Sequence, residues 1–90
     1  MKEAKILHLV DLLNTPPETS VFIETKQTLR PAFFMGVREV IALGGDRYEI
    51  NLITPAKIAK FWKWRLNNQT WRVWSARPTR QQRMEEKWDA

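Results

Sequence analysis

Basic and aromatic side chains are interleaved along the second half of this sequence, and together they could bind a polyanion that carries bases. Residues 54–84 contain eight Lys and Arg and no Asp or Glu, and all five tryptophans lie at or after position 62. Cations pair with phosphates, whereas a flat ring offers a base a stacking platform that tolerates any sequence. The stretch therefore favours a nucleic-acid-binding surface.

The charge of the chain is divided unevenly along its length. Residues 1–53 hold six bases and seven acids, and the last six residues carry a net charge of −2, so the acid-free stretch supplies more than the whole net charge of +5. A chain of 90 residues has room for one modest core. We therefore expect a single domain, 1–90, in which a near-neutral part, 1–53, is joined to a basic, Trp-rich part, 54–84.

The composition excludes several kinds of site. The sequence has no cysteine and one histidine, His8, so it offers no disulfide framework, thiolate zinc site or polyhistidine metal site. The glycines do not form a phosphate-binding loop, and no apolar run is long enough to span a bilayer. We expect a cytoplasmic protein with no catalytic residues, metal, cofactor, small-molecule substrate or membrane partner.

Hydrophobic periodicity and turn residues predict the elements. An amphipathic pattern predicts a helix over 3–14 that stops by Thr15, before Pro16-Pro17. Residues rich in β-branched and aromatic types predict strands over 19–25, from Pro31 or Ala32 to Leu43 with a break at Gly36, and over 47–53, with a hairpin turn at 44–46.

The rest of the chain predicts a helix, a strand and a terminal helix. Thr54-Pro55 is typical of a helix start and predicts a helix to residue 67 or 68. A strand follows over 69–76, and Thr79 with Gln82 forms a capping box for a short helix over 79–88. The order α-β-β-β-α-β indicates a two-layer α+β fold: a mainly antiparallel sheet with two helices on one face and a short C-terminal helix.

These elements place the candidate binding residues. A helix over 55–67 would present three lysines and Trp64 on its solvent face, and the two-residue period of a strand puts Arg72 and Trp74 on one strip. Either Trp71 or Trp74 should then face outward unless the terminal helix covers it. The predicted binding residues are Lys57, Lys60, Lys63, Trp64, Arg72, Trp74, Arg77, Arg80 and Arg83.

The leading functional hypothesis is a small, non-enzymatic protein that binds nucleic acid through backbone contacts and stacking. If about five cations met phosphates, log affinity would fall with log salt at a slope of roughly −4. The alternative is an inhibitor or adaptor that binds an acidic protein surface, since Trp and Arg also dominate protein hot spots. In a third reading the tryptophans are core and the cations a solvated rim. The chain would act as a monomer or a homodimer.

Three resemblances extend these hypotheses. Asp11 with Glu24-Thr-Lys26, in this element order, resembles the Asp…(Asp/Glu)-x-Lys metal-dependent nucleases, which implies Mg²⁺ on the two carboxylates and a lysine that positions water. The α-β-β-β-α portion, with Lys57 and Lys60, resembles a double-stranded-RNA-binding domain.

The third resemblance involves both ends of the chain. The leucine-rich opening, Glu18-Thr-Ser-Val-Phe-Ile23, and Thr70-Trp-Arg-Val-Trp-Ser75 together resemble small accessory proteins of bacteriophages and prophages. That resemblance implies a protein that binds nucleic acid or blocks a host nucleic-acid machine, as anti-CRISPR and anti-restriction proteins do.

Overall fold

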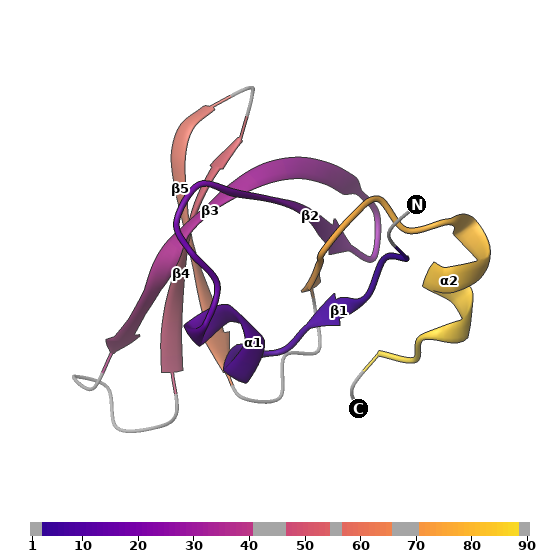
Figure 1. Ribbon diagram of the computed structural model, residues 1–90, viewed down its shortest axis with the longest axis horizontal. Coiled ribbons are helices and arrows are strands. Elements are labelled where there is room, and N and C mark those ends of the chain that lie inside the picture. Colours follow the sequence, from indigo (N-terminus) through magenta and orange to yellow (C-terminus); the bar gives the residue numbers. More distant parts are fainter. Residues whose placement is uncertain (1–2, 41–46, 55–56, 66–70, 89–90) are drawn as a thin grey trace.

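A computed structural model describes residues 3–40, 47–54, 57–65 and 71–88, with the backbone alone described at 39, 40, 47 and 57–65 (Figure 1). The elements in chain order are β1 (Ile6–Leu7), α1 (Leu9–Leu13), β2 (Thr19–Thr25), β3 (Leu29–Val40), β4 (Arg47–Thr54), β5 (Lys57–Arg65), β6 (Trp71–Trp74) and α2 (Arg80–Glu85). The expected turn at 44–46 lies outside the described residues.

The described strands form one antiparallel sheet. Its order is β1-β6-β2-β3-β4-β5, so β2 to β5 follow one another as a meander and β6 returns to lie between β1 and β2. The strands curl around a common interior (Figure 1). The fold is a mainly-β α+β domain, which confirms the coarse class and the antiparallel sheet that the sequence predicts.

Two strands agree closely with their sequence signals. β2 spans Thr19–Thr25, a run of β-branched and aromatic residues, as predicted. β4 spans Arg47–Thr54, one residue longer than predicted, and its alternation buries Ile50 and Leu52 on the inner face of the sheet.

β3 begins at Leu29, two residues before Pro31, so the expectation that Pro31 would limit its start is wrong. The N–H of Thr25 donates to the Thr28 carbonyl at 2.8 Å, and hydrogen-bonded and non-hydrogen-bonded pairs alternate from there along an antiparallel ladder. The Phe22–Pro31 pair is thereby non-hydrogen-bonded, and the proline nitrogen points away from β2. The pairing of β3 with β2 therefore loses no ladder bond at the proline.

A bulge in β3 marks the break that the sequence predicts at Gly36. The register with β4 shifts between Phe34 and Gly36, and Gly36 has a φ of +127°, which a residue with a Cβ rarely adopts. A Cβ built there would meet nothing within 4 Å, so the backbone angle rather than space requires glycine. Such bulges bend a strand, which suits the curl of this sheet.

The helix predicted over 55–68 is wrong, because residues Lys57–Arg65 form strand β5 against β4. Thr54 ends β4 instead of capping a helix. The aromatic and β-branched content of KIAKFWKWR suits a strand, and pairing along β4 satisfies its backbone on that side. The second helix that the RNA-binding resemblance requires is therefore a strand at these residues.

The N-terminal helix is much shorter than predicted, because Ile6–Leu7 pair with β6. Lys5 extends this pairing by accepting the Ser75 N–H at 2.9 Å. The helix α1 then spans only Leu9–Leu13, with the Asp11 carboxylate accepting the N–H of His8 at 2.9 Å. It ends before Thr15, as the two prolines predict.

The helix α2 spans Arg80–Glu85 and begins with the predicted capping box. Thr79 accepts the Gln82 N–H at 3.1 Å, and the Gln82 side chain accepts the Thr79 N–H at 2.8 Å. The expectation of two helices on one face of the sheet is wrong, because Lys57–Arg65 form a strand. The helix α1 inserts Leu12 into the interior, while α2 lies against the opposite, outer face of β2 and β6.

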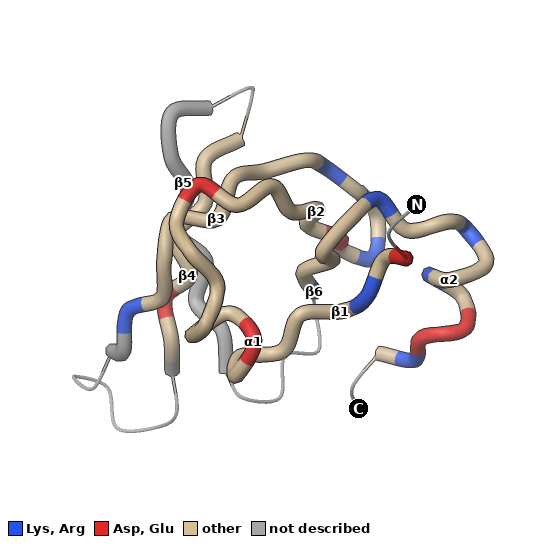
Figure 2. Tube along the Cα trace, in the orientation of Figure 1, with Lys and Arg blue, Asp and Glu red and all other residues tan. Residues whose placement is uncertain are grey.

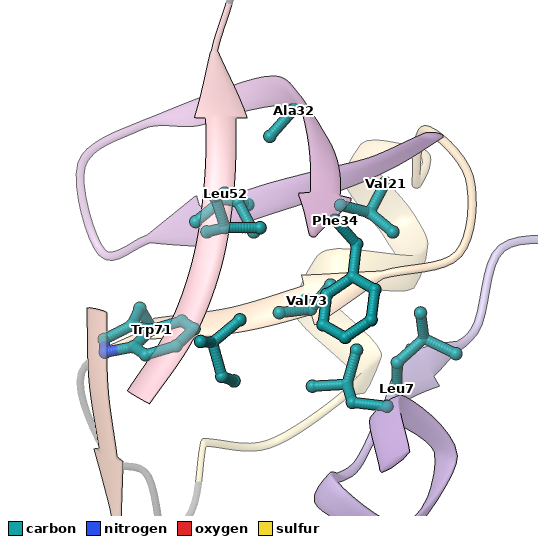
Figure 3. Packing of buried hydrophobic residues seen from close by; sticks show 10 residues of the cluster. Leu7, Val21, Ala32, Phe34, Leu52, Trp71 and Val73 are labelled. Carbon is teal, nitrogen blue, oxygen red and sulfur yellow. The ribbon is translucent and has the colours of Figure 1, made fainter. Parts of the chain in front are cut away.

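One apolar core fills the interior of the curled sheet. Its side chains come from β1, β2, β3, β4, β6 and α1 and point toward one another (Figure 3). Members include Leu7, Leu12, Val21, Ile23, Ala32, Phe34, Ile50, Leu52, Trp71 and Val73.

Candidate functional site

Both faces of β6 are buried, and the outer one carries charge. Trp71 and Val73 belong to the apolar core, whereas Arg72 and Trp74 lie on the outer face with exposures of only 5% and 1%. In the register, Arg72 is opposite Glu24 of β2 and Trp74 is opposite Phe22. A charged and aromatic group therefore lies beneath the C-terminal segment.

Glu24 is the centre of this group. Its Oε1 accepts bonds from Arg72 Nε at 2.6 Å and from Trp74 Nε1 at 2.7 Å, while its Oε2 accepts one from Arg83 Nε at 2.9 Å. The carboxylate is 4% exposed, so these donors replace the water that it loses. We call Glu24, Arg72, Trp74, Arg83 and Trp88 the Glu24 cluster.

Arg72 joins the sheet to the end of α2. One terminal nitrogen of its guanidinium donates to the Glu86 carbonyl and the other to the Arg83 carbonyl, each at 2.8 Å. The last carbonyls of a helix have no partner within it and attract cations. The Trp88 ring covers the guanidinium at 4.3 Å and the Trp74 ring lies 5.2 Å from it. Arg72 thus holds the C-terminal segment against the sheet.

The surroundings of Glu24 lower its pKa. Burial alone would raise the pKa, but the hydrogen bonds from Arg72, Arg83 and Trp74, together with the charge of Arg72, outweigh burial. The carboxylate is therefore ionised at neutral pH. One carboxylate faces two guanidiniums, so the Glu24 cluster keeps a net positive charge.

The exposed strip predicted for Arg72 and Trp74 is wrong. Both side chains are buried, and the C-terminal segment covers Arg72 with the Trp88 ring and with the carbonyls of Arg83 and Glu86. Neither Trp71 nor Trp74 therefore faces solvent. Arg83 is half-buried and paired with Glu24. These three predicted binding residues hold the fold together in this conformation.

The environment of Glu24 also bears on the nuclease resemblance. Both carboxylate oxygens already accept bonds from cationic or indole donors, so a metal ion would have to displace them. Among the described residues, no three His, Cys, Asp or Glu side chains come together in a way that could hold a metal ion. Glu24 acts here as the partner of two arginines.

The other predicted cations lie on separate elements. Arg77 and Arg80 are exposed, and Arg77 lies over Phe22 of β2 while Arg80 begins α2. Lys57, Lys60, Lys63 and Trp64 lie on β5, the edge strand of the sheet, in register with Thr54, Leu52, Glu49 and Tyr48.

An aromatic surface that the sequence analysis missed lies on the outer face of β2 and β3. Phe33 is 46% exposed, and Pro31, its neighbour along the same face of β3, is opposite Phe22 in β2. The guanidinium of Arg77 lies 5.3 Å from the centre of the Phe22 ring. We call Phe22, Pro31, Phe33 and Arg77 the open face. The sequence did contain a signal for this surface. Successive side chains of a strand point to opposite faces, so Phe33 and Phe34 in Pro31-Ala32-Phe33-Phe34 must lie on opposite faces of β3.

The open face lies in a basic part of the molecule. Lys and Arg positions gather at the end that carries α2, where acidic positions are also present, whereas α1 bears only an acidic position (Figure 2). Arg77 and Arg80 are among the exposed cations there. Stacking and phosphate pairing are therefore both available on this side.

No family model, curated protein or solved structure matches this chain. Neither of the two described helices is long and apolar enough to cross a membrane.

Proposed function

We propose that this protein binds single-stranded nucleic acid without catalysing a reaction, using the open face as a stacking platform. The observation that carries the proposal is the exposure of Phe33 on the same face of the sheet as Phe22. The Arg77 guanidinium lies over the Phe22 ring. Bases stack on such rings with little regard to sequence, and a neighbouring arginine can pair with a phosphate or stack in turn.

Exposed aromatic residues on a β-sheet are better suited to binding single-stranded nucleic acid than duplexes. A duplex keeps its bases stacked on one another, whereas an unpaired base is free to lie on a ring. Arg77 supplies a cation beside the Phe22 ring, Arg80 is exposed at the start of α2, and three further lysines lie in the sequence of β5.

The test is a titration of labelled oligo-dT, oligo-U and a matched duplex, followed by fluorescence anisotropy between about 50 and 200 mM salt. Contacts from Arg77 and Arg80 alone would give a log–log slope of roughly −1.4, and five phosphate contacts that include Lys57, Lys60 and Lys63 would give roughly −3.5. A slope near zero, or tighter binding to the duplex, contradicts the proposal.

Phe33→Ala tests the stacking contact itself. Losing one base–ring stack costs about 1–3 kcal/mol, so affinity should fall about 5- to 150-fold. Val10→Ala is the matched control, because Val10 is also an exposed apolar residue but lies on α1. Equal affinities of the two variants would contradict stacking on Phe33.

A protein-binding function is the second candidate. Val10 and Leu13, three residues apart in α1, are both more than half exposed, as is usual for an apolar docking helix. Absence of oligonucleotide binding at low salt would favour this candidate over the first.

A further inference from the structure

Two residues of the open face, Phe22 and Pro31, belong to a longer row that crosses the outer face of the sheet. In the register, Pro31 of β3 is opposite Phe22 of β2, Phe22 is opposite Trp74 of β6, and Trp74 is opposite Ile6 of β1. Four side chains from four neighbouring strands are thus aligned. Pro31 is exposed, whereas Trp74 is almost completely covered.

The C-terminal segment from α2 to Trp88 lies over Arg72, which is on the same face of β6 as Trp74. It places the Trp88 ring on the guanidinium of Arg72 at 4.3 Å and inserts Arg83 toward Glu24. Unstacked nucleobases stack on guanidinium planes as well as on aromatic side chains. The indole of Trp88 therefore occupies the place on Arg72 that a base could take.

The contacts that hold this cover are mainly polar. The helix α2 buries none of its residues, and its largest apolar side chain, Met84, is 75% exposed. Segments with little buried apolar surface open at a lower cost than the core. If the segment lifted away, Arg72 and Trp74 would keep their bonds to Glu24, since all three belong to β2 and β6.

We infer that the segment from α2 to Trp88 is a displaceable cover, and that single-stranded nucleic acid replaces it on Arg72. This inference rests on the proposed function. A base takes the position of the Trp88 ring, and a phosphate takes the two Arg72 terminal nitrogens that now donate to the Arg83 and Glu86 carbonyls. The bound strand then extends from Phe33 across Phe22 to Arg72.

The test compares Trp88→Ala with Met84→Ala in the full chain, using oligo-dT as the probe. Met84 lies on the same helix but is exposed, so its replacement leaves the cover in place. Apparent affinity scales with the fraction of molecules whose cover is displaced. If Trp88→Ala raises this fraction from about 5% to about 50%, oligo-dT affinity rises about tenfold. Met84→Ala should match the wild type.

A second readout follows Trp88 in the wild-type protein. Its indole NMR resonance should move toward the random-coil position when oligo-dT is added, since the ring leaves Arg72. If the wild type binds oligo-dT with Trp88 unmoved, or if Trp88→Ala binds no more tightly than Met84→Ala, the cover is disproved and the proposed function stands. If no variant binds, the proposed function fails and this inference fails with it. Should Trp88→Ala not fold, Arg83→Gln replaces it, with the same expected gain.

Discussion

The two faces of β6 are equally buried, yet they are stabilised in different ways. On the inner face, Trp71 and Val73 join a core of apolar side chains from five strands and α1. On the outer face, Arg72 and Trp74 are buried beside Glu24, and the C-terminal segment contributes hydrogen bonds and a stacked ring to Arg72 and an ion pair to Glu24. Burial of a strand on both sides therefore does not require apolar residues on both sides.

The difference between the faces lies in what each needs to remain buried. Apolar packing depends on shape and area and is insensitive to pH. A buried ion pair is stabilising only while both partners are present and charged, because removing one leaves an uncompensated charge. The inner face should thus respond to changes of volume, and the outer face to changes of charge.

The largest expected effect is on the inner face. Phe34→Ala removes a fully buried ring from the core and should lower the free energy of unfolding by about 3–5 kcal/mol. Phe33→Ala is the matched control one residue away, on the outer face and half exposed. Urea denaturation followed by Trp fluorescence measures both. Similar losses for the two variants would contradict the division into faces.

The next effect is on the outer face. Glu24→Gln keeps the size of the side chain but leaves Arg72 buried without its counter-charge, which should cost about 3 kcal/mol at pH 7. Glu18→Gln, an exposed acid in the preceding turn, should change stability by less than about 0.5 kcal/mol. A Glu24→Gln protein as stable as the wild type would show that the charge is dispensable.

Lowering the pH should reduce the stability that the outer face supplies and leave that of the inner face unchanged. The folded-state pKa of Glu24 is lowered from an ordinary value of 4.5, so the unfolded chain takes up the proton first as pH falls. The stability that Glu24 supplies is complete above that ordinary value and is lost as pH falls through the lowered pKa. The stability difference between wild type and Glu24→Gln, measured in urea from about pH 7 to pH 3, should therefore shrink on acidification. A constant or growing difference would contradict this origin.

The smallest effect concerns the start of the cover. Thr79→Ala removes the side-chain acceptor of the Gln82 N–H, a change worth about 1 kcal/mol to a helix. Because α2 buries no residue, this loss should appear as faster hydrogen exchange of the Gln82 amide and not as a lower urea midpoint. A shift of the whole unfolding transition would mean that α2 unfolds together with the core.

Local signals predicted the elements whose boundaries depend on nearby residues. The strand Thr19–Thr25 and the capping box of Thr79 and Gln82 each depend on a few consecutive residues, and both predictions are confirmed. The segment Lys57–Arg65 is different, because its charges fit a helix surface while its aromatic residues fit a strand. Pairing with β4 decides between these, and that pairing is not visible in a local pattern.

The site was harder to predict because its contacts join distant parts of the chain. Arg72 and Trp74 were expected to be exposed, but their shared partner, Glu24, lies about half the chain away. A signal was present: Glu24 follows Val-Phe-Ile, and Arg72 lies within Trp-Arg-Val-Trp, so each is a single charge in an apolar strand. Two such opposite charges are candidates for a cross-strand pair. The open face could not be predicted from local patterns, because it depends on which residues of β2 and β3 lie opposite each other.

The proline of β3 has a consequence for how the outer surface is built. Its nitrogen, which has no hydrogen to donate, points away from β2, so the Phe22–Pro31 pair needs no ladder bond at that position. The pyrrolidine ring is exposed opposite Phe22. An apolar ring can therefore be displayed on the outer side of β3 without weakening the pairing of β2 with β3 beneath it.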